Sequence, residues 1–295
     1  MTLLRCATLV VEDIDAATAC YAEWLDYSMV ESGTIPAHLA AAWQAPASAG
    51  KRYAVMEPQS GEPVFLRFVE GDPVPDYLPI RTYGWAATEI CVTDVEAVHQ
   101  RMLASPFEVI GPPRPLDGYA TIKPMQVRGP EAEIVYLTEF ARDDPALALP
   151  QPKTLIDRPF IMVHACRDLN AGLVWLRDVL GLQAIDPVSI RYTMIERAFD
   201  LTPEDKTAIT TAQWPGGETF LEFDQYPEAA KDRPKHLGAL PPGVAIVTML
   251  HPELARLEGH WLSPPVRREG PLYEGRTVGV LQTPEGALLE VIDAG

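Results

Sequence analysis

The sequence predicts an α+β protein built from four βαβββ modules, which pair into two domains that each form a curled mixed sheet around a cleft. Two observations carry this prediction. The order strand, helix, strand, strand, strand recurs along the chain. In addition, the second half of the chain repeats short sequence patterns of the first half at a nearly constant offset.

The first module begins with an apolar, β-branched run at 3–11, which predicts a strand. Asp13 or Asp15 can cap the helix that follows, in which apolar residues recur at helical spacing over 14–25. Three extended stretches at 28–35, 51–57 and 63–70 complete the module. The second module repeats this order, with a strand at 85–92, a helix at 94–103 and strands at 107–110, 122–128 and 132–140.

A connector with four prolines at 141–159 separates the halves. We therefore predict domains at 1–145 and 158–295, joined by a linker at 146–157. The third module has a strand at 160–166, a helix at 168–180 and strands near 191–196, 208–213 and 218–224. The fourth has strands at 244–249, 277–282 and 287–292, with a helix near 252–258.

The repeat can be followed residue by residue. The motif at 13–16 returns at 168–171, and the motif at 65–68 (FLRF) returns at 220–223 (FLEF), both at an offset of 155. The motif at 130–132 returns at 284–286, at an offset of 154. Two anchors some 50 residues apart at one offset indicate that the halves are duplicates.

Composition excludes several classes of protein. With 24 basic and 41 acidic side chains the net charge is −17, which disfavours nucleic acids and anionic membrane surfaces as partners. The four cysteines form no CxxC pair, so neither a zinc ribbon nor a disulfide framework is expected. No apolar run is long enough for a membrane helix, and the N-terminus lacks the features of a signal peptide. We expect a cytoplasmic protein that binds a small molecule, without membrane or nucleic-acid partners.

Four segments carry a resemblance to a known family: 11–27 (VEDIDAATACYAEWLDY), 166–182 (CRDLNAGLVWLRDVLGL), 129–139 (GPEAEIVYLTE) and 283–292 (TPEGALLEVI). They resemble the vicinal oxygen chelate superfamily, which includes glyoxalase I, extradiol dioxygenases and bleomycin-resistance proteins. The resemblance covers nearly the whole chain. It implies the fold, and it leaves open whether modules pair within one chain or between the chains of a homodimer.

The resemblance also implies a divalent metal site, formed by a His in a module's first strand and a Glu in its last. The matching first-strand positions here hold no His: they fall on Cys6, Ala87, Ile161 and Gly243 or Val244. The last-strand positions give Arg67, Tyr136, Glu222 and Glu290. A standard site of His and Glu ligands is therefore improbable, although the second half keeps both acids.

Glu222 and Glu290 are the main candidate site residues, because a carboxylate in an apolar strand must be paired, hydrogen-bonded or protonated. If duplicate modules face each other, both acids look into one cleft. There they could bind a divalent ion, act as general acid–base groups, or serve only the structure.

Arg67, Glu89, Tyr136 and Tyr226 are candidate substrate-binding residues. An ion pair between Arg67 and Glu89 that replaces the metal is the competing interpretation, and Tyr226 either lines the cleft entrance or ends its strand. His164 and Cys6 are expected to be buried structural residues.

Two functions follow as expectations. The first is a lyase, isomerase or dioxygenase-like enzyme that acts on a small organic compound, aromatic compounds included, in the second-domain cleft. The alternative is a non-catalytic, metal-free protein that sequesters a hydrophobic or aromatic compound. The retained acids favour the enzyme, and the missing histidines favour the binder.

Overall fold

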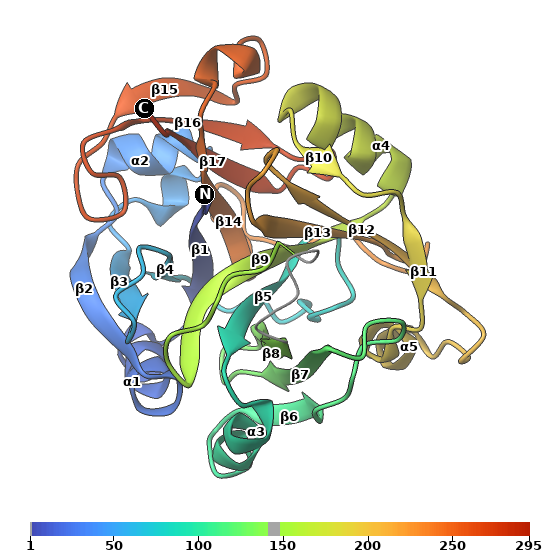
Figure 1. Ribbon diagram of the computed structural model, residues 1–295. Helices are drawn as coiled ribbons and strands as arrows, with labels where there is room; N and C mark the ends of the chain where they lie inside the picture. The colour runs from blue at the N-terminus through green and yellow to red at the C-terminus, as the bar shows by residue number, and fades with distance from the viewer. Residues whose placement is uncertain (1, 141–147) are drawn as a thin grey trace.

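The computed structural model describes residues 2–140 and 148–295 and contains four modules of strands, the first three of which carry α-helices (Figure 1). The first two modules comprise β1 (Leu4–Val11), α1 (Ile14–Leu25), β2 (Tyr27–Thr34), α2 (Ala37–Ala42), β3 (Arg52–Pro58) and β4 (Phe65–Glu70), then β5 (Gly84–Val92), α3 (Val95–Leu103), β6 (Glu108–Gly111), β7 (Ile122–Arg128) and β8 (Ile134–Phe140).

The third module comprises β9 (Ile156–Cys166), α4 (Leu169–Val174), β10 (Gln183–Ala184), β11 (Val188–Ile190), α5 (Thr193–Phe199), β12 (Thr207–Gln213) and β13 (Thr219–Gln225). The fourth comprises β14 (Gly243–His251), β15 (Ser263–Arg267), β16 (Thr277–Gln282) and β17 (Leu288–Asp293). The predicted α+β class and the four modules are therefore confirmed. Among the described residues, none of the helices has the length and apolar character needed to cross a membrane.

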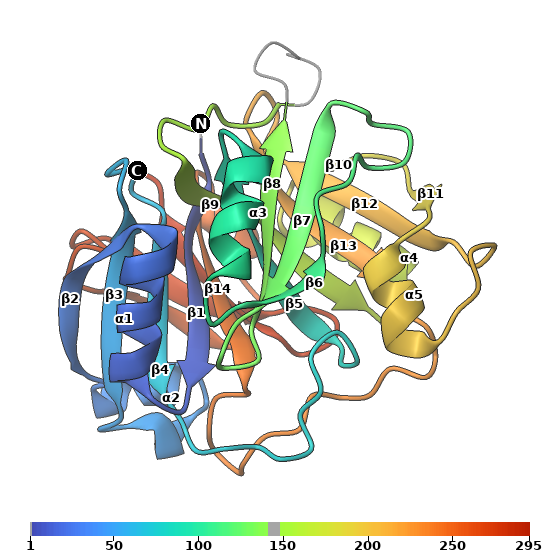
Figure 2. The same cartoon turned by 90° about the horizontal axis from the view of Figure 1, so that it is seen from below.

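The helix starts follow the predicted capping chemistry. Asp13 accepts hydrogen bonds from the backbone N–H groups of Asp15 and Ala16 at the start of α1. Asp94 and Asp168 cap α3 and α4 in the same way. Helices α1, α3 and α4 pack on the strands of their own modules, as Figure 2 shows for α1 and α3, whereas α5 packs against β6 of the second module. This packing leaves the other face of each sheet free to form a cleft.

Two local predictions are wrong. The segment 191–196 is not a strand: it forms the start of α5, and the adjacent strand β11 is only three residues long. The segment 252–258 contains only a 3₁₀ turn at Leu254–Leu257 instead of an α-helix. Both segments are short, and the tertiary packing of short segments overrides local sequence preference.

The modules pair in an order that the sequence repeat does not predict. One sheet has eight strands, in the order β15-β16-β17-β14-β1-β4-β3-β2, and so joins the first module to the fourth. The other has nine strands and joins the second module to the third through the antiparallel pair β5–β9. The pairing lies within one chain, and each sheet takes strands from both halves.

The predicted division into 1–145 and 158–295 therefore does not correspond to the two sheets. It remains a prediction about the duplication of the sequence, and its first boundary lies outside the described residues. The physical reason is that β1 and β5 each find an antiparallel partner in the opposite half, β14 and β9 respectively.

Candidate functional site

Two adjoining cavities lie on the concave side of the nine-stranded sheet. Their volumes are about 160 Å³ and about 370 Å³. Five residues contribute to the walls of both: Glu89, Leu116, Ile122, Ile209 and Glu222. The other residues in the wall of the larger cavity are mostly aliphatic and aromatic. An apolar pocket with a few convergent polar groups is the usual form of a small-molecule site.

The two acids reach the cavities from strands on either side of the sheet's centre. Glu89 lies on β5 beside Tyr136 of β8. Glu222 lies on β13 between Val163 of β9 and Thr211 of β12. Because β5 and β9 are hydrogen-bonded to each other, β13 and β5 flank β9, and side chains on one face converge.

Each acid has a hydroxyl partner. Glu89 Oε1 accepts a hydrogen bond from Thr138 Oγ1. The Tyr192 hydroxyl lies 3.4 Å from Glu222 Oε1 and 3.1 Å from the Tyr136 hydroxyl. Among the described residues, no arginine or lysine forms an ion pair with either acid. The acids are therefore held by neutral donors.

Burial without a cationic partner changes the protonation of these acids. Burial raises the pKa of Glu89 to about 8, and the charge of Glu222 adds to this. Burial likewise raises the pKa of Glu222 to about 7. Asp224, two residues along β13, has its pKa raised well above its usual range, first by burial and then by Glu222. Near neutral pH the cluster therefore holds protons that ordinary carboxyls would have lost.

Asp224 is almost completely buried, with 1% of its surface exposed. Its Oδ1 has no hydrogen-bond partner among the residues that the structure describes. Its raised pKa keeps the carboxyl neutral, which makes this burial tolerable.

Tyrosines supply the other polar groups of the cleft. Burial raises the pKa of both Tyr136 and Tyr192 well above 10, so both hydroxyls stay protonated. Tyr192 is the donor, and its hydroxyl reaches both Tyr136 and Glu222. Tyr226 is also buried, with 3% of its surface exposed, but it packs edge-on against Phe199 and is absent from both cavity walls. Of the predicted substrate-binding tyrosines, only Tyr136 reaches a cavity.

Three arginines in the wall of the smaller cavity already have partners. Arg114 pairs with Asp117 at 3.2 Å, and Arg191 makes two hydrogen bonds to Glu196, of 2.7 and 3.1 Å. The third, Arg197, donates to the backbone carbonyl of Ile110 in β6. These contacts fix the rim of the cavity, and the acids neutralise the charges of Arg114 and Arg191 but not that of Arg197.

The equivalent place in the eight-stranded sheet is filled by an ion pair. Arg67 Nη2 lies 2.9 Å from Glu290 Oε2, and both side chains are buried. Glu290 also accepts hydrogen bonds from Trp43 at 2.8 Å, Thr248 at 2.9 Å and Tyr273 at 3.0 Å. Burial alone would raise the pKa of Glu290, but Arg67 and these donors lower it below its usual value.

The structure therefore separates the two main candidates. Glu222 and Glu290 lie in different sheets, so the prediction that they face one cleft is wrong, and so is a metal site made from both. The predicted Arg67–Glu89 ion pair is wrong for the same reason, because Arg67 pairs with Glu290. Glu222, Glu89 and Tyr136 are brought together, and Arg67 and Glu290 form the other cluster.

Three polar residues were not predicted as site residues: Thr138 and Tyr192 line the cavities, and Asp224 lies beside Glu222 on β13. Asp224 could have been found, because it follows Glu222 by two residues on one strand and so shares its face. Thr138 follows Tyr136 in the same way. No sequence signal marks Tyr192, which lies between a three-residue strand and a short helix.

The expected structural residues are buried. His164 stacks on Phe223, with ring centroids 4.5 Å apart, on the face opposite Glu222. Cys6 is completely buried near Arg67, and burial raises the pKa of its thiol to about 12. Neither residue reaches the two cavities of the nine-stranded sheet.

The donor set of the cleft does not fit the divalent metal site of the family it resembles. No histidine lines either cavity. Within the described residues, Glu89 and Glu222 belong to no group of three ligand atoms close enough to share an ion. Two carboxyls and neutral hydroxyls form a site suited to proton transfer.

No protein-family model and no curated protein matches the chain. Solved structures do resemble it. A glyoxalase I variant from Zea mays has a TM-score of 0.68 at 14% identity, covering 98% of this chain and 93% of that one. A putative dioxygenase from Bacillus subtilis has a TM-score of 0.61 at 11% identity, covering 98% and 84%. The chain therefore has the curled-sheet fold of glyoxalase I and other vicinal oxygen chelate proteins.

Proposed function

We propose that this protein is an isomerase or lyase that moves a proton on a small organic substrate in the cleft of the nine-stranded sheet. The observation that carries the proposal is the Glu89–Glu222 pair, which lies in the shared wall of two cavities and has raised pKa values. Paired carboxyls whose pKa values are displaced toward neutrality are typical of acid–base sites.

The chemistry follows from the proton content of the pair. Near neutral pH one carboxyl is protonated and the other is ionised, because two adjacent negative charges are costly in a buried site. The ionised carboxylate removes a proton from a carbon next to a carbonyl. The protonated carboxyl then gives a proton to another position or to a leaving group. The pair again holds one proton, now on the other carboxyl, and movement of that proton between the two acids restores the starting state.

The cavity walls favour an apolar substrate body. Phe160, Ile161 and Ile209 border the larger cavity, and Tyr136 borders the smaller. The hydroxyls of Thr138 and Tyr192 orient the carboxyls. A small aromatic or branched aliphatic compound that carries one carbonyl group matches this lining.

The test follows deuterium exchange by ¹H NMR. The protein is incubated in D₂O with a panel of enolisable aryl and alkyl carbonyl compounds, and loss of the proton signal next to the carbonyl is recorded. Wild-type protein should accelerate exchange for at least one compound, and Glu89→Gln and Glu222→Gln should each slow it by at least about 10²-fold. The control Glu228→Gln, at an exposed position, should behave as wild type.

A second function is favoured by a separate observation. The larger cavity has a mostly apolar wall, which suits a protein that only sequesters a hydrophobic compound. In that case a ligand from the same panel binds, as seen by native mass spectrometry, without any exchange. Equal affinity in wild type and Glu222→Gln, with no exchange in either, would select this function.

A further inference from the structure

A second cluster of reactive side chains lies outside the cleft, where the two sheets meet. His164 and Cys166 are at the end of β9, and Glu285 is in the turn between β16 and β17. One ligand atom from each lies within 4.8 Å of the others. From this arrangement we propose that Cys166, His164 and Glu285 form a zinc site that ties the nine-stranded sheet to the eight-stranded sheet.

The donor types and spacing suit Zn²⁺. Thiolate sulfur, imidazole nitrogen and carboxylate oxygen are its usual ligands, at about 2.0–2.3 Å. These bond lengths place sulfur and nitrogen about 3.5 Å apart around a tetrahedral ion. Cys166 Sγ lies 3.5 Å from His164 Nδ1. A single ion binds one ring nitrogen, and that is Nδ1, because Nε2 lies 2.9 Å from Thr283 Oγ1. Glu285 Oε2 lies 3.7 Å from Nε2 and so borders the same ring.

One ligand atom lacks a hydrogen-bond partner in the described part of the chain. The Glu285 side chain is 4% exposed, and its Oε2 makes no hydrogen bond to residues 2–140 or 148–295. A buried carboxylate oxygen without a donor is costly, and a cation between it and the neighbouring sulfur and nitrogen removes that cost. Its other oxygen, Oε1, accepts a hydrogen bond from the backbone N–H of Arg167 at 3.0 Å.

The internal repeat separates the structural role of Glu285 from the proposed one. Its counterpart at an offset of 154 is Glu131, whose Oε2 accepts a hydrogen bond from the backbone N–H of Glu12. Both copies thus use this acid to cap the turn after a first strand. At an offset of 155, however, Leu9 and Val11 stand where the second half has His164 and Cys166. The backbone cap therefore needs neither the imidazole nor the thiol.

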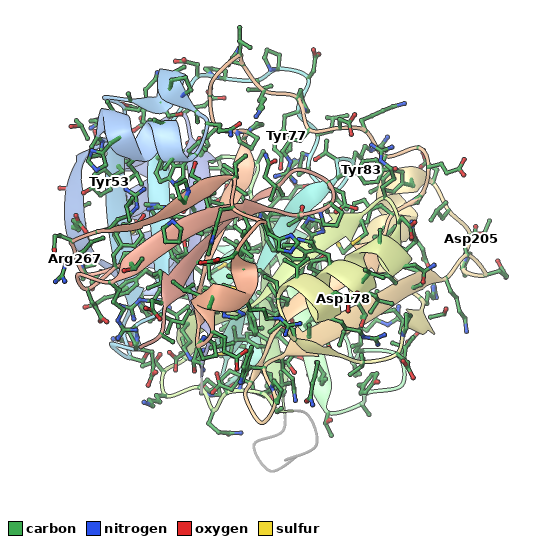
Figure 3. The ribbon with its side chains drawn as sticks, turned by 90° about the horizontal axis from the view of Figure 1, so that it is seen from above. Tyr53, Tyr77, Tyr83, Asp178, Asp205 and Arg267 are labelled. Carbon is green, nitrogen blue, oxygen red and sulfur yellow. The ribbon has the colours of Figure 1, made fainter. Side chains whose placement is uncertain are left out.

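A zinc role also fits the access to the cluster better than a nucleophilic one. Cys166 and His164 are completely buried, so no substrate carbon can reach the sulfur. An ion can enter beside Glu285, which borders a cavity of about 310 Å³ between the sheets, lined also by Tyr83 (labelled in Figure 3). Binding releases the Cys166 thiol proton to solvent, and Thr283, 2.9 Å from His164 Nε2, keeps the ring in place.

The test uses Co²⁺ as a spectroscopic probe and Zn²⁺ as a competitor on chelator-treated full-length protein. We expect one equivalent of Co²⁺ to produce a sulfur-to-cobalt charge-transfer band, which Zn²⁺ abolishes. Cys166→Ser should lose the band. Glu285→Gln, which keeps the amide oxygen for the cap, should bind about tenfold or more weakly. Cys20→Ser removes a partly exposed thiol and should leave the band unchanged.

A thermal measurement keeps the proposal testable if Cys166→Ser fails to fold. At one fixed Zn²⁺ concentration, the melting temperature of wild type and of Cys20→Ser should rise by more than that of Glu285→Gln. A wild-type protein without a charge-transfer band at saturating Co²⁺ would overturn the proposal. A band that persists in Cys166→Ser, or disappears in Cys20→Ser, would overturn it equally. None of these outcomes depends on the acid–base function of the other cleft.

Discussion

Arg67 and Glu290 lie 2.9 Å apart in the eight-stranded sheet, at the positions that Glu222 and Tyr136 hold in the nine-stranded sheet. The sequence offsets of 155 and 154 relate the two pairs directly. In the eight-stranded sheet the pair is a carboxylate and a guanidinium, and their ion pair fills the site. In the other it is an acid with a tyrosine, and the carboxyls remain available beside two cavities.

The Arg67–Glu290 pair should therefore be essential for stability. Glu290→Gln keeps the shape but leaves the Arg67 guanidinium buried and uncompensated, which should lower the free energy of unfolding by about 3–5 kcal/mol. Urea denaturation followed by circular dichroism measures the loss. The exposed pair of Arg52 and Glu70 is the control, since Glu70→Gln should cost less than about 1 kcal/mol. Equal losses in both variants would contradict the structural role of Glu290.

The Glu89–Glu222 pair should make stability fall as the pH rises. Because folding raises both pKa values from the ordinary 4.5 of a glutamate, to about 8 and about 7, the folded protein holds more protons than the unfolded chain. The stabilisation is complete below about pH 4.5 and is lost as the pH rises through 7 and 8. In Glu89→Gln the loss of unfolding free energy between pH 5 and 9 should be smaller than in wild type, by on the order of 3 kcal/mol.

Glu133 provides the matched comparison for this measurement. Its pKa is also raised by burial, to about 7, but it is bonded to Tyr21 under α1, far from the cavities in the fold. Glu133→Gln should flatten the stability curve too, yet leave ligand binding and proton exchange unchanged. A Glu89→Gln variant with the pH slope of wild type would show that Glu89 is not protonated in the folded state.

The sequence predicts these elements better than it predicts their assembly. Strand alternation, helical spacing and the capping aspartates are local signals, and the helices begin where Asp13, Asp94 and Asp168 indicate. Which module pairs with which depends on contacts such as β1 with β14, between residues more than 200 positions apart. A repeat shows that two segments are alike without showing that they are neighbours. For this reason Glu222 and Glu290 were identified as buried acids but placed in the wrong relation.

Tyr192 should tune the acid–base pair through its hydroxyl. Its hydrogen bond stabilises the ionised form of Glu222 and so lowers the pKa of that acid against the effect of burial. Tyr192→Phe should move the acidic limb of the exchange rate against pH to higher pH, with a smaller effect at high pH where the base is already ionised. The measurement is the deuterium-exchange rate between pH 5 and 9. If the exchange rate falls equally at every pH and the acidic limb of the curve does not shift, Tyr192 contributes only by packing.

Filling the cavities should block ligand binding without disturbing the carboxyls. Leu116 belongs to the loop over the cleft and contributes to both cavity walls, so Leu116→Trp places an indole in the space that a substrate needs. We expect ligand affinity to fall at least about tenfold, because the added ring removes apolar contact area and volume together. Leu237→Trp, at a fully exposed position, should bind as wild type does. Calorimetry measures ligand affinity in both variants. Unchanged affinity in Leu116→Trp would place the ligand elsewhere. As a control, the stability of Leu116→Trp should keep the pH dependence of wild type, which would show that Glu89 and Glu222 are intact.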